Sequence, residues 1–357
     1  MRTKEQNIEL IKNLSNAFGI SGFEDEVVEI CKTQLENFAD FKEDSLRNLY
    51  FNLKNYQNQD LKVWLDAHTD EVGFIVQYLK NNGTLGFLPV GGWVPSTVPA
   101  SKVKIKNLDG EYVTGVVASR PPHFSKGSDN NPSLSEMVID VGATSKDELM
   151  SDFRIGVAAP VAPSVECEFI DKKDIFIGKA FDCRIGVAAL LETLNQIKDE
   201  NLNVDVIGTL TAQEEVGLRG AQAATKMIDA DVAIVFEGAP ADDTFLPGEQ
   251  IQTGLRRGPM LRHFDVSMIN NPRFMRHAIN VAQTHNIPIQ EAVRSGGGTN
   301  GGAIHLSKNG IPTIVISIPV RYVHSHHGIV AYEDYLAAIE LAKNVIKSLN
   351  EEVVNSF

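Results

Sequence analysis

Acidic and histidine side chains stand where apolar, strand-like segments of the chain end or where a helix-like segment begins. Seven such positions stand out: His68, Asp70, Asp182, Glu214, Glu215, Glu237 and His324. Open α/β sheets bind their ligands at the carboxyl ends of strands. These residues are therefore candidates for a catalytic or metal-binding site.

Two of the clusters have a spacing that suggests a role. In His68-x-Asp70 the imidazole could bind a metal while the carboxylate holds the other ring nitrogen. The adjacent Glu214 and Glu215 point to opposite sides of an extended segment, so one could face a metal and the other the water that the metal activates. Each cluster also has a plainer interpretation, a strand-end turn for His68 and a solvent-exposed turn for the glutamates.

The remaining positions also leave alternatives open. Asp182 precedes a helical pattern and is either an N-cap or a carboxylate placed to bridge two cations. Three histidines within four residues, His324, His326 and His327, form either a metal-like cluster or an exposed tract. If only one of them is a ligand, we expect it to be His324, which is nearest the end of the preceding apolar segment.

Taken together, five of these residues predict a metal centre. His68, Asp182, Glu215, Glu237 and His324 are separated by 114, 33, 22 and 87 residues, which excludes a local finger-type site. Two histidines and three carboxylates form a mixed nitrogen and oxygen ligand set that suits two zinc-like divalent ions. We therefore expect an active site assembled from several strand ends.

The elements that must position these residues alternate between strand and helix in most of the chain. Residues 72–164 differ, because short alternating apolar runs separated by turn signals indicate a small antiparallel barrel or sandwich. Helices are predicted over 4–18, 23–38, 184–198, 272–285 and 333–349, and strands over 61–66, 203–212, 230–237 and 311–320. This pattern predicts an α/β sheet with helices on both faces, into which the β-rich stretch is inserted.

Length and composition limit the class of protein. The 357 residues suggest about two domains. The net charge of −13 makes nucleic acid an unlikely partner on electrostatic grounds, and no segment approaches the roughly 18 apolar residues of a membrane span. Three cysteines cannot form a paired disulfide framework, which predicts reduced thiols and a cytoplasmic protein.

Seven further motifs stand along the chain: DAHTDEVGF (66–74), GGW (91–93), ASRPPH (118–123), KAFDCRIG (179–186), TAQEEVGLRGA (211–221), GGGTNGGAIH (296–305) and ISIPVRYVHS (316–325). In their content and order they resemble one known family, the tetrahedral aminopeptidases, which are glutamyl-aminopeptidase-like di-metal peptidases whose members are often labelled cellulases or endoglucanases. The resemblance covers essentially the whole chain.

The resemblance implies a phosphorylase/hydrolase-like, three-layer α/β/α catalytic domain with an inserted β-rich, barrel-like domain. It implies a discontinuous catalytic domain over 1–69 and 165–357 and an inserted dimerisation domain over 70–164. It also implies a peptide substrate and self-association into dimers and hollow tetrahedral dodecamers. The implied cofactors are two divalent ions per subunit, with zinc expected and cobalt or manganese as alternatives.

The family's pattern also implies a role for each site residue. His68 and the acid at 237 would bind one metal, Glu215 and His324 the other, and Asp182 both. Glu214 would be the general base, taking a proton from the metal-activated water and passing it to the leaving amine. Asp70 would support His68.

This chain departs from the family's pattern at three positions. Glu237 stands where the family usually has aspartate, Cys183 replaces the second acid of the usual Asp-Asp pair, and Asn300 replaces the acid of GGTDAGAIH. Glutamate still offers an oxygen ligand, and we expect Cys183 to support the site rather than bind metal. Asn300 is expected to alter the local hydrogen bonding.

Two other functions compete with the peptidase. An endoglucanase would use a pair of acids such as Glu214 and Glu237 and would need no metal, so the histidines would be idle. A non-catalytic oligomeric shell would result if the altered acids had abolished metal binding. Chelation and metal analysis separate these possibilities.

Overall fold

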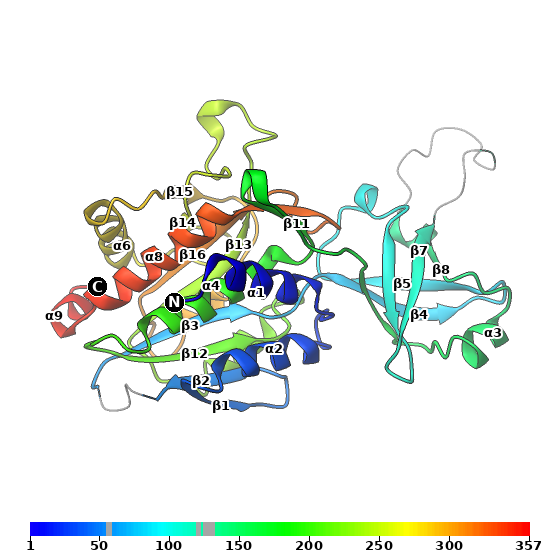
Figure 1. Cartoon of the computed structure of the whole chain (residues 1–357), viewed down its shortest axis with the longest axis horizontal. Helices are drawn as coiled ribbons and strands as arrows, with labels where there is room; N and C mark the ends of the chain where they lie inside the picture. Colours follow the sequence, from blue (N-terminus) through cyan, green and yellow to red (C-terminus); the bar gives the residue numbers. More distant parts are fainter. Residues whose placement is uncertain (55–58, 119–122, 124–132) are drawn as a thin grey trace.

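The fold centres on one mixed eight-stranded sheet. The computed structural model describes residues 1–54, 59–118, 123 and 133–357. The strand order is β1–β2–β12–β3–β13–β16–β14–β15 (Figure 1), and the strands in that order are Ala39–Glu43, Leu49–Leu53, Asp205–Thr211, Lys62–His68, Val232–Pro240, Thr313–Val320, Met260–Phe264 and Gln290–Val293. The central strands β12, β3, β13 and β16 are mutually parallel, so their carboxyl ends meet at one edge of the sheet.

Helices cover both faces of this sheet, as the alternating pattern predicts. Along β3, Val63 and Leu65 point into a large apolar core, whereas Trp64 points to a second, smaller core on the opposite face. The large core holds α1 (Lys4–Asn16), α2 (Asp25–Leu35), α4 (Phe181–Ile197), α6 (Pro272–Thr284), α8 (Tyr332–Ser348) and α9 (Glu351–Asn355), and the smaller one holds α5 (Arg219–Ala224) and α7 (Gly301–Ile304).

Helix α4 lies at the centre of the larger helical layer. It contacts β3 and β13 on one side and α1 and α8 on the other, and its residues from Cys183 to Leu194 are all buried. A helix enclosed in this way is apolar on every side, as the run IGVAALL is. The half-buried Asp182 lies at a kink near the start of α4, where Asp182 and Cys183 have non-helical backbone angles.

The β-rich stretch forms a closed antiparallel barrel with a core of its own. Its strand order is β4–β5–β8–β7–β6–β9, comprising Gly73–Leu79, Thr84–Val90, Val138–Asp140, Tyr112–Ala118, Lys102–Lys106 and Pro160–Pro163. The barrel lies beside the sheet (Figure 1), and along the chain it is inserted between β3 and the strands that precede α4. The predicted insertion of a small antiparallel barrel is confirmed.

Some elements differ from the sequence prediction. A six-residue helix, α3 (Lys146–Ser151), lies within the β-rich stretch and is too short to show helical periodicity. In a separate three-stranded sheet, β11 (Ile175–Gly178) pairs on one side with β10 (Glu168–Ile170) and on the other with β17 (Gly328–Ala331), which comes about 150 residues later in the chain. Most of the ASRPPH motif lies outside the described residues.

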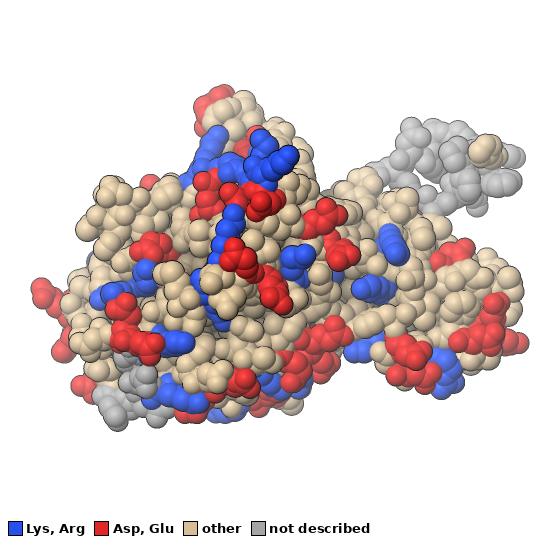
Figure 2. All heavy atoms as spheres, viewed as in Figure 1, with Lys and Arg blue, Asp and Glu red and all other residues tan. Residues whose placement is uncertain are grey.

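The exterior carries charges of both signs. On the face shown in Figure 2, acidic and basic side chains are interspersed over the helical part and the barrel. The described cysteines Cys31, Cys167 and Cys183 are buried and unpaired by disulfides. Among the described helices, none is long and apolar enough to cross a membrane.

A buried arginine ties α4 to the sheet and to the loop after α1. The guanidinium of Arg184 donates to the carbonyl oxygens of Thr69 (2.6 Å), Leu14 (2.7 Å) and Gly19 (3.0 Å). It also lies 3.4 Å from the carboxylate of Glu71, which accepts from Lys179 at 2.5 Å. Only 1% of Arg184 is exposed, so these contacts replace its hydration.

We predict that Arg184→Met lowers the free energy of unfolding by about 3–5 kcal/mol, because several buried acceptors lose their donor and Glu71 loses one of its two cations. Urea denaturation measures this loss. The control Arg273→Met changes an exposed arginine of α6 and should cost less than about 0.5 kcal/mol. A loss below about 1 kcal/mol for Arg184→Met would contradict this role.

Candidate metal centre

The carboxyl-end edge of the sheet brings the predicted residues together. His68 is the last residue of β3, and Thr211 at the end of β12 pairs with it in register. The turn after β12 carries Glu214 and Glu215, and the turn after β16 carries His324. Glu237 lies inside β13, which continues to Pro240 instead of ending at 237 as predicted. Residues spread over the whole sequence thus converge on one edge.

Asp182 lies between the two histidines. Its Oδ1 is 3.1 Å from His68 Nε2, and its Oδ2 is 3.5 Å from His324 Nε2. Helix α4 has Ala180 as its N-cap residue, and no side-chain cap hydrogen bond is formed there. Asp182 and Cys183 have non-helical backbone angles at a kink near the start of α4, and the carboxylate of Asp182 faces the two imidazoles.

Each histidine has further carboxylates beside it. His68 Nε2 is 3.4 Å from Glu237 Oε1 and 3.9 Å from Glu214 Oε2. His324 Nε2 is 3.1 Å from Glu215 Oε2. The arrangement thus divides into one half around His68 and another around His324, with Asp182 reaching both.

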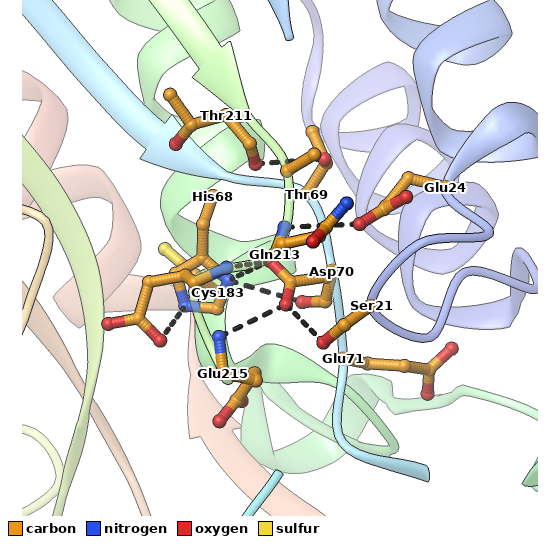
Figure 3. Close-up of polar contacts among 12 residues, drawn as sticks. Ser21, Glu24, His68, Thr69, Asp70, Glu71, Cys183, Thr211, Gln213 and Glu215 are labelled. Carbon is orange, nitrogen blue, oxygen red and sulfur yellow. Dashed lines mark hydrogen bonds and ion pairs between the residues drawn. The ribbon is translucent and has the colours of Figure 1, made fainter. Parts of the chain in front are cut away.

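Asp70 contacts both His68 and the turn that carries Glu214 and Glu215. Its backbone oxygen and Oδ1 lie 3.2 and 3.3 Å from His68 Nδ1, so Nε2 faces the carboxylates. Its carboxylate also accepts the backbone N–H groups of Glu214 (2.9 Å) and Glu215 (3.1 Å). Figure 3 shows Asp70 lying between His68 and Glu215. One fully buried carboxylate therefore orients both the histidine and the two glutamates.

The electrostatics of the site are dominated by crowded carboxylates. Burial raises the pKa of Glu214 well above its usual value, and the negative charges of Glu215 and Glu237 add to this effect. Burial also raises the pKa of Glu215 to about 7. Burial acts in the opposite direction on His324, yet hydrogen bonds to Asp182 and Glu215 raise its pKa to about 11. Carboxylates held this close together either take up protons or need positive charge beside them, and bound cations would supply that charge.

The donor set fits divalent metal ions. Three groups of side chains bring ligand atoms within 4.8 Å of one another: His68 with Cys183 and Glu237, His68 with Glu214 and Glu215, and Asp182 with Glu215 and His324. Glu215 Oε1 is buried and has no hydrogen-bond partner among the described residues. A buried carboxylate oxygen without a partner is costly, and a metal ion at this position would satisfy it.

The other two histidines of the cluster lie apart from these groups. His326 is buried and packs its ring at 5.4 Å from that of Trp93 in the barrel, and His327 is exposed. Neither belongs to the three groups of possible ligands described above. The choice of His324 among the three histidines agrees with this geometry.

The three departures from the family's pattern have different surroundings. The Cys183 thiol is buried and donates to the carbonyl oxygen of Phe236 at 3.2 Å, beside His68 and Glu237. The Asn300 amide donates to Asp66 Oδ2 (2.8 Å) and to Thr211 Oγ1 (2.6 Å). Asn300 therefore acts on the buried Asp66, two residues before His68 on β3, rather than on the ligand atoms themselves.

Sequence reasoning missed two residues of the site's surroundings. Ser21 donates to Asp70 Oδ2 at 2.6 Å, and Glu24 accepts from the backbone N–H of Gln213 at 3.1 Å. Both belong to the loop between α1 and α2 and lie outside the motifs quoted above. Their contacts join residues 49 and 189 positions apart, so no local spacing signals them.

Fold and site together define a metal-dependent hydrolase, and comparison with known proteins gives its family. Residues 48–341 match the model of the M42 glutamyl aminopeptidase family. The chain therefore belongs to the M42 glutamyl aminopeptidases, a family of metallo-aminopeptidases. Family membership favours peptide hydrolysis over the endoglucanase alternative and implies metal ions.

Individual relatives support this assignment over nearly the full length. A glutamyl aminopeptidase of Lactococcus lactis subsp. cremoris is 31% identical over 348 residues, covering 96% of this chain and 97% of the relative. The crystal structure of a TET aminopeptidase from a marine sediment archaeon of the Thaumarchaeota is 39% identical, with a TM-score of 0.94 and coverage of 98% and 99%. The Pyrococcus horikoshii TET1 peptidase, which can assemble into a tetrahedron or a large octahedral shell, is 27% identical, with a TM-score of 0.86 and coverage of 96% and 100%.

We predict that Asn300→Asp destabilises the protein at pH 8 by about 1–3 kcal/mol and by less at pH 5. A second carboxylate would face Asp66, whose pKa burial already raises to about 6. The folded pair would bind more protons than the unfolded chain, so stability is lost as the pH rises through the raised pKa.

Urea unfolding at the two pH values measures this difference. The control Asn280→Asp adds a charge at an exposed position of α6 and should show neither effect. Equal losses at both pH values for Asn300→Asp would refute the explanation by charge repulsion.

Proposed function

We propose that this chain is an aminopeptidase that removes N-terminal residues from peptides with two divalent metal ions and Glu214 as the general base. In this proposal His68 and Glu237 hold one ion, Glu215 and His324 hold the other, and Asp182 binds both. The observation that carries it is the position of Asp182, whose two oxygens lie 3.1 and 3.5 Å from the two separate imidazoles. A carboxylate with one oxygen toward each histidine is suited to bridge two ions.

The ligand chemistry supports zinc, with cobalt or manganese as alternatives. Imidazole nitrogens with carboxylate oxygens form a borderline ligand set that zinc accepts readily. When bound, the ions would lower the pKa of a water molecule and polarise the scissile carbonyl group. The positive charge of the ions would then offset the negative charge of the crowded carboxylates.

Glu214 is suited to move the proton. Its carboxylate lies 3.9 Å from His68 Nε2, and we assign it to neither ion. Its side chain is 12% exposed, so the carboxylate remains partly accessible to water while its surroundings are largely dry. In the proposed reaction Glu214 accepts a proton from the attacking water and donates it to the amine that leaves.

Asp70 is proposed to prepare the site for this step. It holds His68 by Nδ1, which leaves Nε2 available as a ligand atom. It also holds the backbone of Glu214 and Glu215, so that the base and the ligand keep a fixed relative position. Such preorganisation is worth several powers of ten in rate when it is complete.

We further propose a homo-oligomeric, cytoplasmic enzyme. The Pyrococcus horikoshii relative can assemble into a tetrahedron, and the separate barrel of this chain is a suitable dimerisation unit. On this view residues 70–164 form the dimerisation domain and residues 1–69 and 165–357 the catalytic domain. Its three unpaired cysteines are compatible with a reducing compartment.

One prediction of the proposed function concerns the base. Glu214→Gln should lower kcat on aminoacyl chromogenic substrates by about 10²–10⁴-fold, because the amide cannot accept the proton. The metal content and the thermal unfolding temperature should remain those of the unaltered chain. Steady-state kinetics and metal analysis of the same preparation measure these quantities.

The matched control alters the proposed bridging ligand. Asp182→Asn should lower the metal content as well as the rate, because one carboxylate oxygen between the histidines is lost. Glu214 would be removed from the role of base if Glu214→Gln turned over at a normal rate, or if it lost metal as Asp182→Asn does.

Another prediction separates the proposed peptidase from its alternatives. Chelation should abolish aminopeptidase activity, and zinc, cobalt or manganese added to the stripped protein should restore it. The unaltered protein should contain divalent metal and should not hydrolyse cellulose.

Peptidase activity that survives complete metal removal would exclude the proposed mechanism. Metal-free purified protein that stays inactive after metal addition would instead indicate a non-catalytic shell.

A further inference from the structure

The turn that carries Glu214 and Glu215 is held by side chains instead of by neighbouring strands. The backbone N–H of Ala212 donates to Asn48 Oδ1 (2.9 Å) and that of Gln213 to Glu24 Oε1 (3.1 Å). The next two N–H groups donate to the two oxygens of Asp70. Four successive amides thus end on side-chain oxygens directly after β12, where the sheet no longer supplies acceptors.

Two of the groups that hold this turn come from the loop between α1 and α2, residues 17–24. Ser21 donates its hydroxyl to Asp70 Oδ2 at 2.6 Å, the same oxygen that accepts from Glu215 N–H. Glu24 accepts at Oε1 from Gly22 N–H (2.8 Å) as well as from Gln213. Figure 3 shows Ser21 and Glu24 converging on Asp70 and Gln213 from the same loop.

The loop itself is anchored firmly enough to position other groups. Gly19 accepts at its carbonyl oxygen from Arg184 (3.0 Å) and from the backbone N–H of Glu71 (2.9 Å). Ile20 forms a parallel bridge with Glu71 and is fully buried. A Cβ atom at position 19 would lie 2.8 Å from the Arg184 guanidinium and 2.9 Å from a methyl group of Val27, so a larger residue would displace these side chains. The loop is thereby fixed to α4 and to the start of the barrel.

Glu24 has a position that packing alone does not account for. It is completely buried, and its Oε2 has no hydrogen-bond partner among the described residues. Its Oε1 contacts backbone amides rather than a cation. Burying a carboxyl group in this way costs stability, which an apolar residue would avoid. Gln213, which it holds, adopts a left-handed φ of 56°, unusual for a residue other than glycine.

We propose that Ser21 and Glu24 are positioning residues of the active site, which hold the Glu214–Glu215 turn in place through Asp70 and Gln213. Ser21 fixes the Asp70 oxygen that holds Glu215, and Glu24 fixes the residue before Glu214. This inference rests on the proposed roles of Glu214 as base and Glu215 as ligand. Ser21 and Glu24 are both buried, so each would act through the residue it holds.

The first test measures metal binding, independently of catalysis. The stripped full-length chain is titrated with Co²⁺ and followed by its visible absorption. Ser21→Ala should weaken Co²⁺ binding by about 10–100-fold, the range found when an outer residue supporting a metal ligand is removed. Ser21→Thr keeps a hydroxyl group and should bind Co²⁺ nearly as the unaltered chain does.

The second test measures turnover. In the metal-loaded enzyme Ser21→Ala should lower kcat by about tenfold or more with little change in KM, because a displaced base acts on the transition state rather than on substrate binding. The matched control is Ser15→Ala, which removes another buried hydroxyl, one that donates to the carbonyl oxygen of Lys179 (2.7 Å). This control should lower the unfolding temperature without changing kcat or Co²⁺ affinity.

Glu24 provides an independent pair of variants should Ser21→Ala fold poorly. Glu24→Gln retains an oxygen that can accept from Gln213 and should keep most of the activity. Glu24→Leu removes the acceptor at similar volume and should lose kcat and Co²⁺ affinity as Ser21→Ala does. Circular dichroism of each variant verifies that it is folded.

The proposal is overturned if folded Ser21→Ala and Glu24→Leu keep both quantities within about twofold of the unaltered chain, or if Ser15→Ala lowers them equally. Failure of the proposed function gives a different result. If the unaltered, metal-loaded chain hydrolyses none of the aminoacyl substrates, the peptidase proposal fails, while the Co²⁺ titrations still decide whether Ser21 and Glu24 hold the turn.

Discussion

The mutual repulsion of carboxylates at one edge of the sheet is the constraint on which the site depends. Asp182, Glu214, Glu215 and Glu237 meet around two imidazoles, in surroundings that are largely shielded from water. Acids in such a place either take up protons or require positive charge. A fold that keeps all four carboxylates at one place must hold each of them in position. The site that results favours the binding of cations.

The restraint comes from two sources. Parallel strands β12, β3, β13 and β16 align their ends, which brings His68, Glu237 and the two turns to the same edge. Beyond the strand ends, backbone amides lose their partners in the sheet, and side-chain oxygens accept from them instead. The sheet therefore sets the position of the site, and buried polar side chains set its detailed geometry.

Much of this arrangement could be predicted because its signals are local. An apolar run followed by an ionisable residue predicts a strand end, and His68, Glu215 and His324, which follow such runs, lie within the three groups of possible ligands. The barrel could be predicted for a similar reason, since alternation with period two occurs within single strands. The pattern predicts the end of β13 too early, because an acidic residue usually ends an apolar strand, whereas Glu237 is a buried residue inside this one.

The features that could not be predicted depend on contacts between distant segments. Ser21 donates a hydrogen bond to Asp70, and Glu24 accepts one from a backbone amide 189 residues away. A hydrogen bond to a backbone amide does not depend on the residue type that carries the amide, so the sequence does not indicate it. The pairing of β11 with β17 is similar, since strands of four residues show too little alternation to be recognised. Propensity and periodicity describe neighbours along the chain, whereas these contacts are made by the tertiary fold.

Asn300 shows how a departure from the family's pattern bears on the same electrostatic constraint. Asp66 and His68 are two residues apart on β3 and therefore point to the same face of the sheet. An acid at position 300 would add a further negative charge beside Asp66, whereas the amide of Asn300 donates hydrogen bonds to Asp66 and Thr211. The substitution thus lowers the charge next to the histidine while keeping β3 and β12 linked.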